Sequence, residues 1–565
     1  MYECIIWIFF SEVNTTRSHN RQEIKNRQAA ERPALFLKTD CSAPPYSELT
    51  SRRILPYNKD RYSLNREAVE LKRQFVWIMT DTTRYDMLGC YGNPDMYTPN
   101  LDALAENGLR FDRVYTTQPV CGPARSALFS GQFPHSNGSW GNSMPFGADI
   151  RHIGQRLSDR GIPCAYIGKW HLDAGDYFGN GVCPDGWDPD YWYDMKCYLD
   201  ELTDEERLFS RDCRNNFVNG GISADFTYGH RCADRALRYV DAHAEEDFFL
   251  TVSFDEPHDP SLCPEPYASM YMDKTWPKTP AHYDTLENKP LYQQLWGARN
   301  RFRDRENTEP INPYLLGCNS FIDSEIGRII DRVHEVAPDA LIMFTSDHGD
   351  AMQAHCLYAK GPTTYDEIAR VPLIFEGKAC AKAAVYPGTV SHIDLPATVL
   401  DYMGLDVPQC FEGKSLMPLI DRPEDTPHED CAFVEFTRYE IDHDGFGGFQ
   451  PMRGVVTNRY KLSLHLLDED ELYDCEADPH ELNNLIHDPA YEAIRNELHD
   501  KILGWMNDTR DPFRGYQWKC RPWRTDYEPS WAVDGYTRQR KQEPGGYRQL
   551  DYDTGLPMAE TVRRK

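Results

Sequence analysis

The chain has 565 residues, of which 40% are hydrophobic, a composition typical of a globular protein long enough for more than one domain. Its formal net charge of -28 at pH 7 argues against a nucleic-acid-binding protein, which usually presents a basic face. The 17 cysteines are odd in number and include no Cys-x-x-Cys pair, which favours reduced thiols in a cytoplasmic protein over a disulfide framework or a zinc site.

The N-terminal region carries no convincing targeting segment. An apolar run from Cys4 to Phe10 has no basic residues before it and no small-residue cleavage pattern after it, so it is a poor signal peptide. Residues 11–60 are polar and aperiodic, and no stretch of the chain reaches the length of a membrane span. We therefore expect residues 1–73 to be a poorly ordered extension of a cytoplasmic protein with no membrane partner.

From residue 74 onward, short apolar runs of the buried-strand type alternate with helical patterns. The alternation predicts an α/β fold, with a mostly parallel sheet sandwiched by helices, in a catalytic domain over residues 74–420. The predicted strands are 75–80, 162–167, 248–254, 341–345 and 371–375, and the predicted helices include 98–108, 150–157, 322–333 and 391–403.

One helical segment begins with a cysteine. Pro123 suits the first turn of a helix that starts near Cys121, and Gly131 can end it. A side chain at such a start faces free backbone N–H groups and the positive end of the helix dipole, and Arg125 adds a fixed positive charge. Local chemistry leaves two interpretations open, an inert buried cysteine or a group that meets an anion.

The chain after residue 421 has a different pattern. A Pro- and Asp-rich stretch is followed by short apolar runs at 431–436, 453–457 and 460–464, and 490–505 has the pattern of an amphipathic helix. Strands in series predict a smaller antiparallel sheet. We assign residues 421–565 to a C-terminal subdomain whose tail, from Thr509, wraps the surface.

Polar side chains follow four of the predicted strands of the catalytic domain. They are Asp81, the pair Lys169 and His171, His258, and the pair Asp347 and His348. In open parallel sheets, ligands bind beyond the carboxyl ends of the strands. The sequence therefore predicts an active site where these strands end.

The segment Cys121-x-Pro123-x-Arg125, followed by Leu128-x-Ser130-Gly131, resembles the signature of the sulfatase family. The resemblance covers most of residues 74–485 and implies the alkaline phosphatase-like fold. Further matching motifs are Thr80-Asp81, 88–92, 98–102, 168–172, 253–260, 345–350, Lys360-Gly361, 370–373, Tyr460-Lys461, 471–474 and Asp478-Pro479.

The resemblance implies a role for each matched polar residue. Cys121 is converted to formylglycine by a formylglycine-generating or sulfatase-maturing enzyme, and its hydrate attacks the sulfur of a sulfate ester. Positive charge on Arg125, Lys169 and Lys360 neutralises charge on the sulfate oxygens. His258, with Lys360, assists the leaving alcohol, and His171 is the base that releases sulfate. The expected metal ligands are Asp81, Thr82, Asp347 and His348.

Thr82 departs from the family pattern, which often has a second acidic residue there. His348 offers nitrogen where many relatives bring an amide oxygen. Calcium prefers oxygen ligands, whereas imidazole suits softer ions. Calcium is the ion that the family implies, with Mn²⁺ and Mg²⁺ as alternatives.

Two other functions stay open at this stage. One is a phosphonate or phosphate ester hydrolase of the same superfamily, and the other is a non-catalytic glycan-binding relative. The expected substrate is a sulfated carbohydrate or an aryl sulfate. An aromatic cluster either stacks on sugar rings or belongs to the core, and its members are Trp187, Tyr191, Trp192 and Tyr193.

Overall fold

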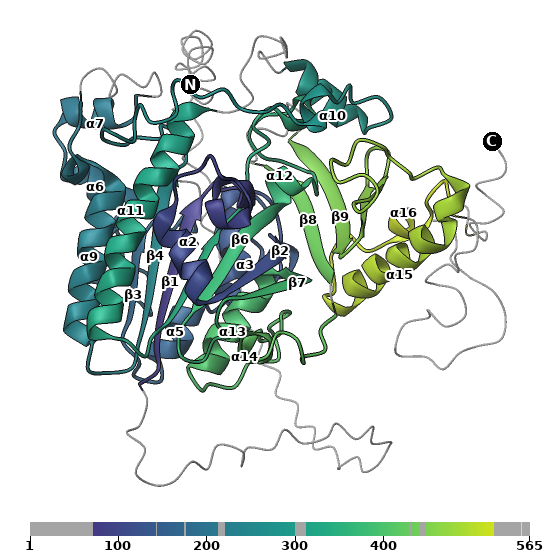
Figure 1. Ribbon diagram of the computed structural model, residues 1–565. Coiled ribbons are helices and arrows are strands. Elements are labelled where there is room, and N and C mark those ends of the chain that lie inside the picture. Colours follow the sequence, from purple (N-terminus) through teal and green to yellow (C-terminus); the bar gives the residue numbers. More distant parts are fainter. Residues whose placement is uncertain are drawn as a thin grey trace, which may run out of the picture. The chain divides into compact units, whose positions relative to one another are not determined.

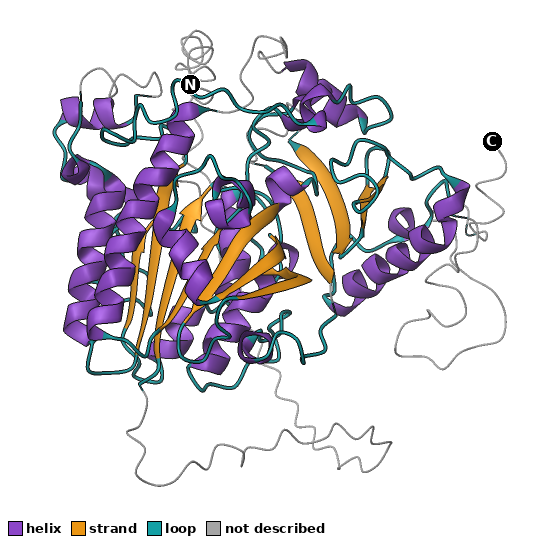
Figure 2. Ribbon diagram, in the orientation of Figure 1, coloured by secondary structure: helices purple, strands orange, loops and turns teal. Residues whose placement is uncertain are grey.

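The computed structural model describes residues 72–142, 144–173, 177–212, 221–299, 312–429, 431–439, 448–524 and 555. Residues 1–71 of the expected N-terminal extension lie outside the described residues. Most of the expected wrapping tail also lies outside them. Two sheets organise the described part, one of seven strands and one of four (Figures 1 and 2). The predicted fold class, a mostly parallel sheet with helices and a smaller antiparallel sheet, is confirmed.

The large sheet has the strand order β3-β4-β1-β5-β6-β2-β7. Its neighbouring strands are parallel except where β6 pairs antiparallel with β5 and β2. Its strands are β1 (Gln74–Asp81), β2 (Leu109–Tyr115), β3 (Cys164–Gly168), β4 (Phe248–Pro257), β5 (Leu341–Ser346), β6 (Arg370–Glu376) and β7 (Ala384–Ser391). All of β1 and β4 is buried, as expected for central strands covered on both faces.

Alternate side chains of β1 enter two different cores. Val76 and Ile78 pack with α2 (Pro99–Asn107), α9 (Tyr228–His243) and α11 (Pro313–Val336), which cover one face of the sheet (Figure 1). Phe75 and Trp77 pack with the other layer, formed by α3 (Cys121–Ser130), α5 (Ile153–Ser158) and α13 (Leu395–Tyr402). The period of two in the strand thus divides the domain into two helical layers.

Shorter elements complete the described chain. The helices are α4 (Pro134–Asn137), α6 (Met195–Asp200), α7 (Asp204–Ser210), α10 (Leu291–Arg299), α12 (Asp366–Ala369) and α14 (Met417–Asp421). The 3₁₀ turns are η3 (Tyr85–Met87), η4 (Gly89–Tyr91), η5 (Ala224–Phe226), η6 (Pro280–Tyr283), η7 (Ala354–Cys356), η8 (His392–Asp394) and η10 (Pro489–Tyr491). In the part of the chain that the structure describes, no helix is both long and apolar enough to cross a membrane.

Strands β2 and β7 were not predicted from the sequence. Charged residues interrupt the apolar pattern of β2, and β7 is an edge strand that contains a proline and exposes Val385. Gly108, between α2 and β2, does not adopt the left-handed conformation that is common where helices end. A Cβ atom on Gly108 would lie 1.9 Å from the carbonyl oxygen of Phe375, so this glycine permits the close approach of β6.

The small sheet is antiparallel, in the order β11-β10-β9-β8. Its strands are β8 (Cys431–Arg438), β9 (Phe449–Thr457), β10 (Tyr460–His465) and β11 (Glu471–Asp474), and it packs with α15 (Glu492–Asp508) and α16 (Tyr516–Lys519). The predicted C-terminal strands and helix are confirmed. Only β11 was missed, because four residues give too short an apolar pattern.

The aromatic cluster around Trp187 belongs to the core. Trp187, Trp192 and Tyr193 are buried, and the Trp187 ring stacks on His152 with its centroid 5.2 Å away. Tyr191 packs edge-on against Tyr239. A sugar-stacking surface made by the three buried residues is therefore excluded.

Candidate active site

Helix α3 presents Cys121 as its first residue, and every residue of the helix is buried. Gly131 ends the helix in the left-handed conformation, with φ of 71°, and its N–H bonds to the carbonyl of Ala127. The side-chain carbonyl of Asn142 accepts a hydrogen bond from the N–H of Gly122 at 2.9 Å, which satisfies one of the free donors at the helix start. The helix that begins at Cys121 is thus fixed at both ends.

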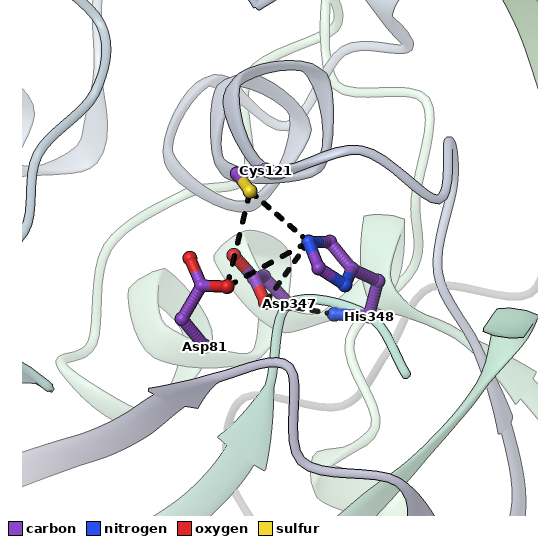
Figure 3. Close-up of side chains that lie close together, drawn as sticks. All are labelled: Asp81, Cys121, Asp347 and His348. Carbon is purple, nitrogen blue, oxygen red and sulfur yellow. Dashed lines mark hydrogen bonds and ion pairs between the residues drawn. The ribbon is translucent and has the colours of Figure 1, made fainter. Parts of the chain in front are cut away.

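The strand ends converge on this helix start, as the sequence predicts. Strands β1 and β5 are parallel neighbours in which Thr80 pairs with Ser346, so Asp81 and Asp347 emerge at the same edge of the sheet. Figure 3 shows both carboxylates and His348 directed toward Cys121. The structure therefore brings together four side chains that lie far apart in sequence.

These four side chains form a candidate metal site, since one ligand atom from each lies within 4.8 Å of all the others. The Nε2 atom of His348 is 3.1 Å from Sγ of Cys121, 3.8 Å from Oδ1 of Asp81 and 3.7 Å from Oδ1 of Asp347 (Figure 3). Its Nδ1 atom lies 2.9 Å from the carbonyl of Gly349, which can only accept a hydrogen bond. Nδ1 therefore carries a proton, and Nε2 is the nitrogen that faces the other three groups.

Buried cations hold the outer oxygens of the two aspartates. Arg125 contacts Oδ2 of Asp81 at 3.1 Å through Nη2 and Oδ2 of Asp347 at 3.0 Å through Nε. Its Nη1 donates to the carbonyl of Lys169 and to the hydroxyl of Ser253. The family resemblance implied that Arg125 contacts the sulfate oxygens, but its guanidinium is instead taken up by these partners, because a buried guanidinium must be paired.

Thr82 serves the aspartates in a similar way. Its hydroxyl donates to Oδ1 of Asp81 at 2.7 Å, and its N–H donates to Oδ1 of Asp347 at 3.2 Å. Its backbone is left-handed, with φ of 74°. The expected metal ligand Thr82 is therefore engaged with both carboxylates, and the donors that face one another are two carboxylates, one imidazole and residue 121. This oxygen and nitrogen set fits a divalent cation.

A second group of side chains contacts Cys121 from its other side. Nζ of Lys360 lies 3.0 Å from Sγ, and Cys121 raises the pKa of both His171 and His258, which places these imidazoles beside the thiol. Lys169 is bound to Asp81, with Nζ 2.8 Å from Oδ2. All residues predicted to be catalytic thus surround residue 121 or the aspartates beside it.

The charges around Cys121 set its ionisation. Burial and Asp81 raise the pKa of the thiol, but Lys360, Lys169 and His348 lower it more, so the pKa lies well below its usual range. For Asp347, burial and the neighbouring Asp81 raise the pKa to about 6. The site therefore favours an anion at residue 121.

Three residues near the site were absent from the predicted set. Asp255 lies at the end of β4, with Oδ1 3.0 Å from Nζ of Lys169. Its position three residues before His258 was a usable signal, because the neighbouring strands β1, β3 and β5 also end at or directly before residues of the site. Tyr177 and Asn142 lie in loops, where neither periodicity nor spacing marks them.

Comparisons with known proteins agree with this geometry. The family model described as Sulfatase matches residues 73–405, and a model of the C-terminal region of N-sulphoglucosamine sulphohydrolase matches residues 354–508. The chain is 41% identical over 491 residues to a protein of Escherichia coli K12 named uncharacterized sulfatase YidJ, covering 86% of this chain and 96% of that one. It is 26% identical over 494 residues to an N-acetylglucosamine-6-O-sulfatase of Bacteroides thetaiotaomicron, covering 77% of this chain and 86% of that one.

Solved structures share the fold. A phosphonate monoester hydrolase of Agrobacterium radiobacter matches with a TM-score of 0.67 at 23% identity, covering 77% of this chain and 96% of that one. The protein BT4656, solved with its substrate D-glucosamine-2-N,6-O-disulfate, matches with a TM-score of 0.62 at 21% identity, covering 78% and 98%. At these identities the likeness extends to the fold alone.

Proposed function

The chain belongs to the sulfatase family and is accordingly a sulfuric ester hydrolase, and we propose that it hydrolyses the sulfate ester of a carbohydrate or an aryl alcohol. We further propose that Cys121 is converted to formylglycine, whose hydrate is the nucleophile. One observation carries the proposal. Residue 121 lies at a helix start between a set of metal-ligating groups and a set of proton-carrying groups.

The first step forms a sulfated enzyme. One hydroxyl of the hydrated residue 121, which loses its proton to solvent beside Lys360, attacks sulfur as an oxyanion. The bond from sulfur to the alcohol oxygen breaks, its electron pair stays on that oxygen, and the oxygen takes a proton. We assign the proton to His258. Burial and the nearby lysines lower the pKa of His258, but Asp81 and the hydrogen bond to Cys121 raise it more, to about 9, so the imidazole is protonated at neutral pH. Lys360 stabilises the negative charge that develops on the leaving alcohol oxygen.

The second step releases sulfate. Burial lowers the pKa of His171, so this imidazole is neutral and can take the proton of the second hydroxyl. The carbon–oxygen bond to the sulfuryl group then breaks, sulfate leaves with the electron pair, and the aldehyde re-forms. Water restores the hydrate.

We propose one divalent cation as cofactor, held by Asp81, Asp347, His348 and residue 121. When bound, it supplies positive charge that polarises a sulfate oxygen. Calcium is the ion that the family implies, and the imidazole nitrogen of His348 supports Mn²⁺ as the alternative. Arg125 and Lys169 would keep the Oδ1 atoms directed inward by holding the Oδ2 atom of each carboxylate.

The names of relatives support the substrate class. One is an N-acetylglucosamine-6-O-sulfatase and another is an arylsulfatase of Clostridium perfringens. The test is expression with and without a sulfatase-maturing enzyme, followed by assays of 4-nitrophenyl sulfate and a panel of sulfated saccharides. Turnover should rise with the aldehyde content of residue 121, measured by peptide mass spectrometry. Turnover that is independent of aldehyde content would contradict the proposal.

A second function, hydrolysis of phosphonate or phosphate esters at the same residue, is favoured by a specific observation. The site holds only two carboxylates, because Thr82 stands at the position of an acidic residue and His348 supplies nitrogen. Turnover of 4-nitrophenyl phenylphosphonate, measured beside 4-nitrophenyl sulfate on one preparation, decides between the two. The third reading, a non-catalytic glycan-binding relative, has no support, because no catalytic group is missing around residue 121.

A further inference from the structure

We propose that Tyr177 and Asp255 are positioning residues, which hold His258 with one nitrogen directed at residue 121 and hold Lys169 against Asp81. The inference rests on the proposed function, since it concerns how the leaving alcohol receives its proton. Tyr177 lies outside the sequence motifs that predicted the site, and Asp255 lies within the motif at 253–260 but was given no role there. Both contact a predicted catalytic residue directly.

Asp255 links Lys169 to the neighbouring loop. Nζ of Lys169 lies between Oδ1 of Asp255 at 3.0 Å and Oδ2 of Asp81 at 2.8 Å, so the ammonium group bridges two strand ends. Burial raises the pKa of Asp255, but Lys169 and His258 lower it more, and the net shift is downward. Asp255 is therefore ionised and can only accept hydrogen bonds.

The hydroxyl of Tyr177 joins Asp255 to His258. It lies 2.5 Å from Oδ1 of Asp255 and 3.2 Å from Nδ1 of His258. Burial and Asp255 raise the pKa of Tyr177 well above its usual range, so the hydroxyl stays protonated and donates a hydrogen bond to the carboxylate. The oxygen of Tyr177 is then left to accept from Nδ1 of His258.

A second acceptor fixes the same nitrogen. Nδ1 of His258 also lies 3.2 Å from the carbonyl oxygen of Asp259, which can only accept. Both neighbours of Nδ1 thus require it to carry hydrogen. Nε2 is then the ring nitrogen that remains for proton transfer at residue 121.

The ring of Tyr177 is held in place independently of its hydroxyl. Two cations make cation–π contacts with the ring. Nζ of Lys169 lies 4.0 Å from the ring centroid, and the guanidinium of Arg211 lies 5.6 Å from it. Arg211 also donates to the carbonyl of Asp259. Removal of the hydroxyl alone therefore leaves the ring and its loop supported, which makes Tyr177→Phe a clean test.

The test measures how turnover depends on the leaving group. A general acid matters little for 4-nitrophenyl sulfate, whose phenolate leaves readily, and matters more for phenyl sulfate. With Tyr177→Phe, we expect kcat to fall less than about threefold for 4-nitrophenyl sulfate and about thirtyfold or more for phenyl sulfate, while KM stays within about twofold. Rates are normalised to aldehyde content.

Tyr193→Phe is the matched control. The hydroxyl of Tyr193 also donates to a carboxylate, Oε2 of Glu201 at 2.6 Å, but it has no contact with the catalytic residues. Tyr193→Phe should leave the ratio of the kcat values for the two substrates unchanged. An equal loss on both substrates with Tyr177→Phe would show a merely structural role and overturn the inference.

Asp255→Asn keeps the inference testable if Tyr177→Phe does not fold. It preserves an acceptor for Tyr177 but removes the charge beside Lys169, and it should also slow phenyl sulfate more than 4-nitrophenyl sulfate. An unchanged ratio there would again overturn the inference. A wild-type enzyme that turns over neither sulfate would overturn the proposed function itself, which separates the two failures.

Discussion

Nζ of Lys360 and Sγ of Cys121 lie 3.0 Å apart although 239 positions separate them in the chain. The loop that carries Lys360 follows β5 and brings the ammonium group to the start of α3. The ammonium group is thus within contact distance of residue 121, whose hydrate is the proposed nucleophile. Interactions of this kind stabilise charge that develops in a transition state.

We expect Lys360→Ala to lower kcat by about 10² to 10³, because a preorganised positive charge next to residue 121 is removed. Steady-state kinetics on 4-nitrophenyl sulfate, normalised to aldehyde content, provide the measurement. The melting temperature should be nearly unchanged, since no buried carboxylate loses its closest partner. A fall in kcat below about threefold would contradict the role of Lys360.

Cys121→Ser should stall after one turnover. A serine hydroxyl can accept the sulfuryl group, but it lacks the second hydroxyl that expels sulfate in the proposed mechanism. Intact-mass spectrometry after incubation with 4-nitrophenyl sulfate should detect a stable sulfate ester on residue 121. Repeated turnover at a rate near that of the wild type would exclude the hydrate mechanism.

His348→Gln tests the metal site without relying on turnover. The substitution replaces the Nε2 ligand by an oxygen, so it should weaken binding of Mn²⁺ more than binding of Ca²⁺. Isothermal titration calorimetry on protein treated with a chelator measures both affinities. An equal change for the two ions, or none, would remove His348 from the ligand set.

Glu256 should make stability fall as pH rises. Burial and the neighbouring Asp255 raise the pKa of Glu256 from its ordinary value of 4.5 to about 8. Its contribution to the free energy of unfolding is therefore complete below pH 4.5 and is lost as pH approaches 8. Between pH 5 and pH 8, the free energy of unfolding of Glu256→Gln should rise by about 2 to 4 kcal/mol relative to that of the wild type. Urea unfolding at the two values measures this, with the exposed Glu106→Gln as control.

Lys461 should couple the small sheet to the loop that carries Lys360. Nζ of Lys461 lies 2.5 Å from Oδ1 of Asp366 and 3.0 Å from Oε1 of Glu481, and all three groups are largely removed from water. Lys461→Met leaves two carboxylates without this partner, so unfolding should become easier by about 3 to 5 kcal/mol. Lys196→Met, which breaks an ion pair exposed at both partners, should have a much smaller effect. Equal effects on urea unfolding would contradict the coupling.

The sequence identified most of the site because each clue was local. An apolar run marks a buried strand, and the polar residue at its end marks the edge of the sheet, as for Asp81 and Asp347. The strands β2 and β7 escaped detection because charge in one and edge exposure in the other obscured the apolar pattern.

The partners of each polar group could not be read in the same way. Arg125 was expected to face sulfate, but it bonds to Asp81 and Asp347, whose positions depend on the packing of α3 against two strands. The hydrogen bonds of Tyr177 to Asp255 and His258 depend on a loop that no periodic pattern constrains. Such contacts require distances accurate to a few tenths of an ångström between segments far apart in the chain.

The sequence by itself therefore determined which residue types meet at the carboxyl edge of the sheet, because hydrophobic periodicity and strand direction are properties of short segments. The tertiary structure alone decided how these residues share their protons and charges, because that depends on long-range packing. His348 illustrates both levels. Its place after β5 is visible in the sequence, whereas the Gly349 carbonyl that fixes its proton on Nδ1 and turns Nε2 toward Cys121 is visible only in the fold.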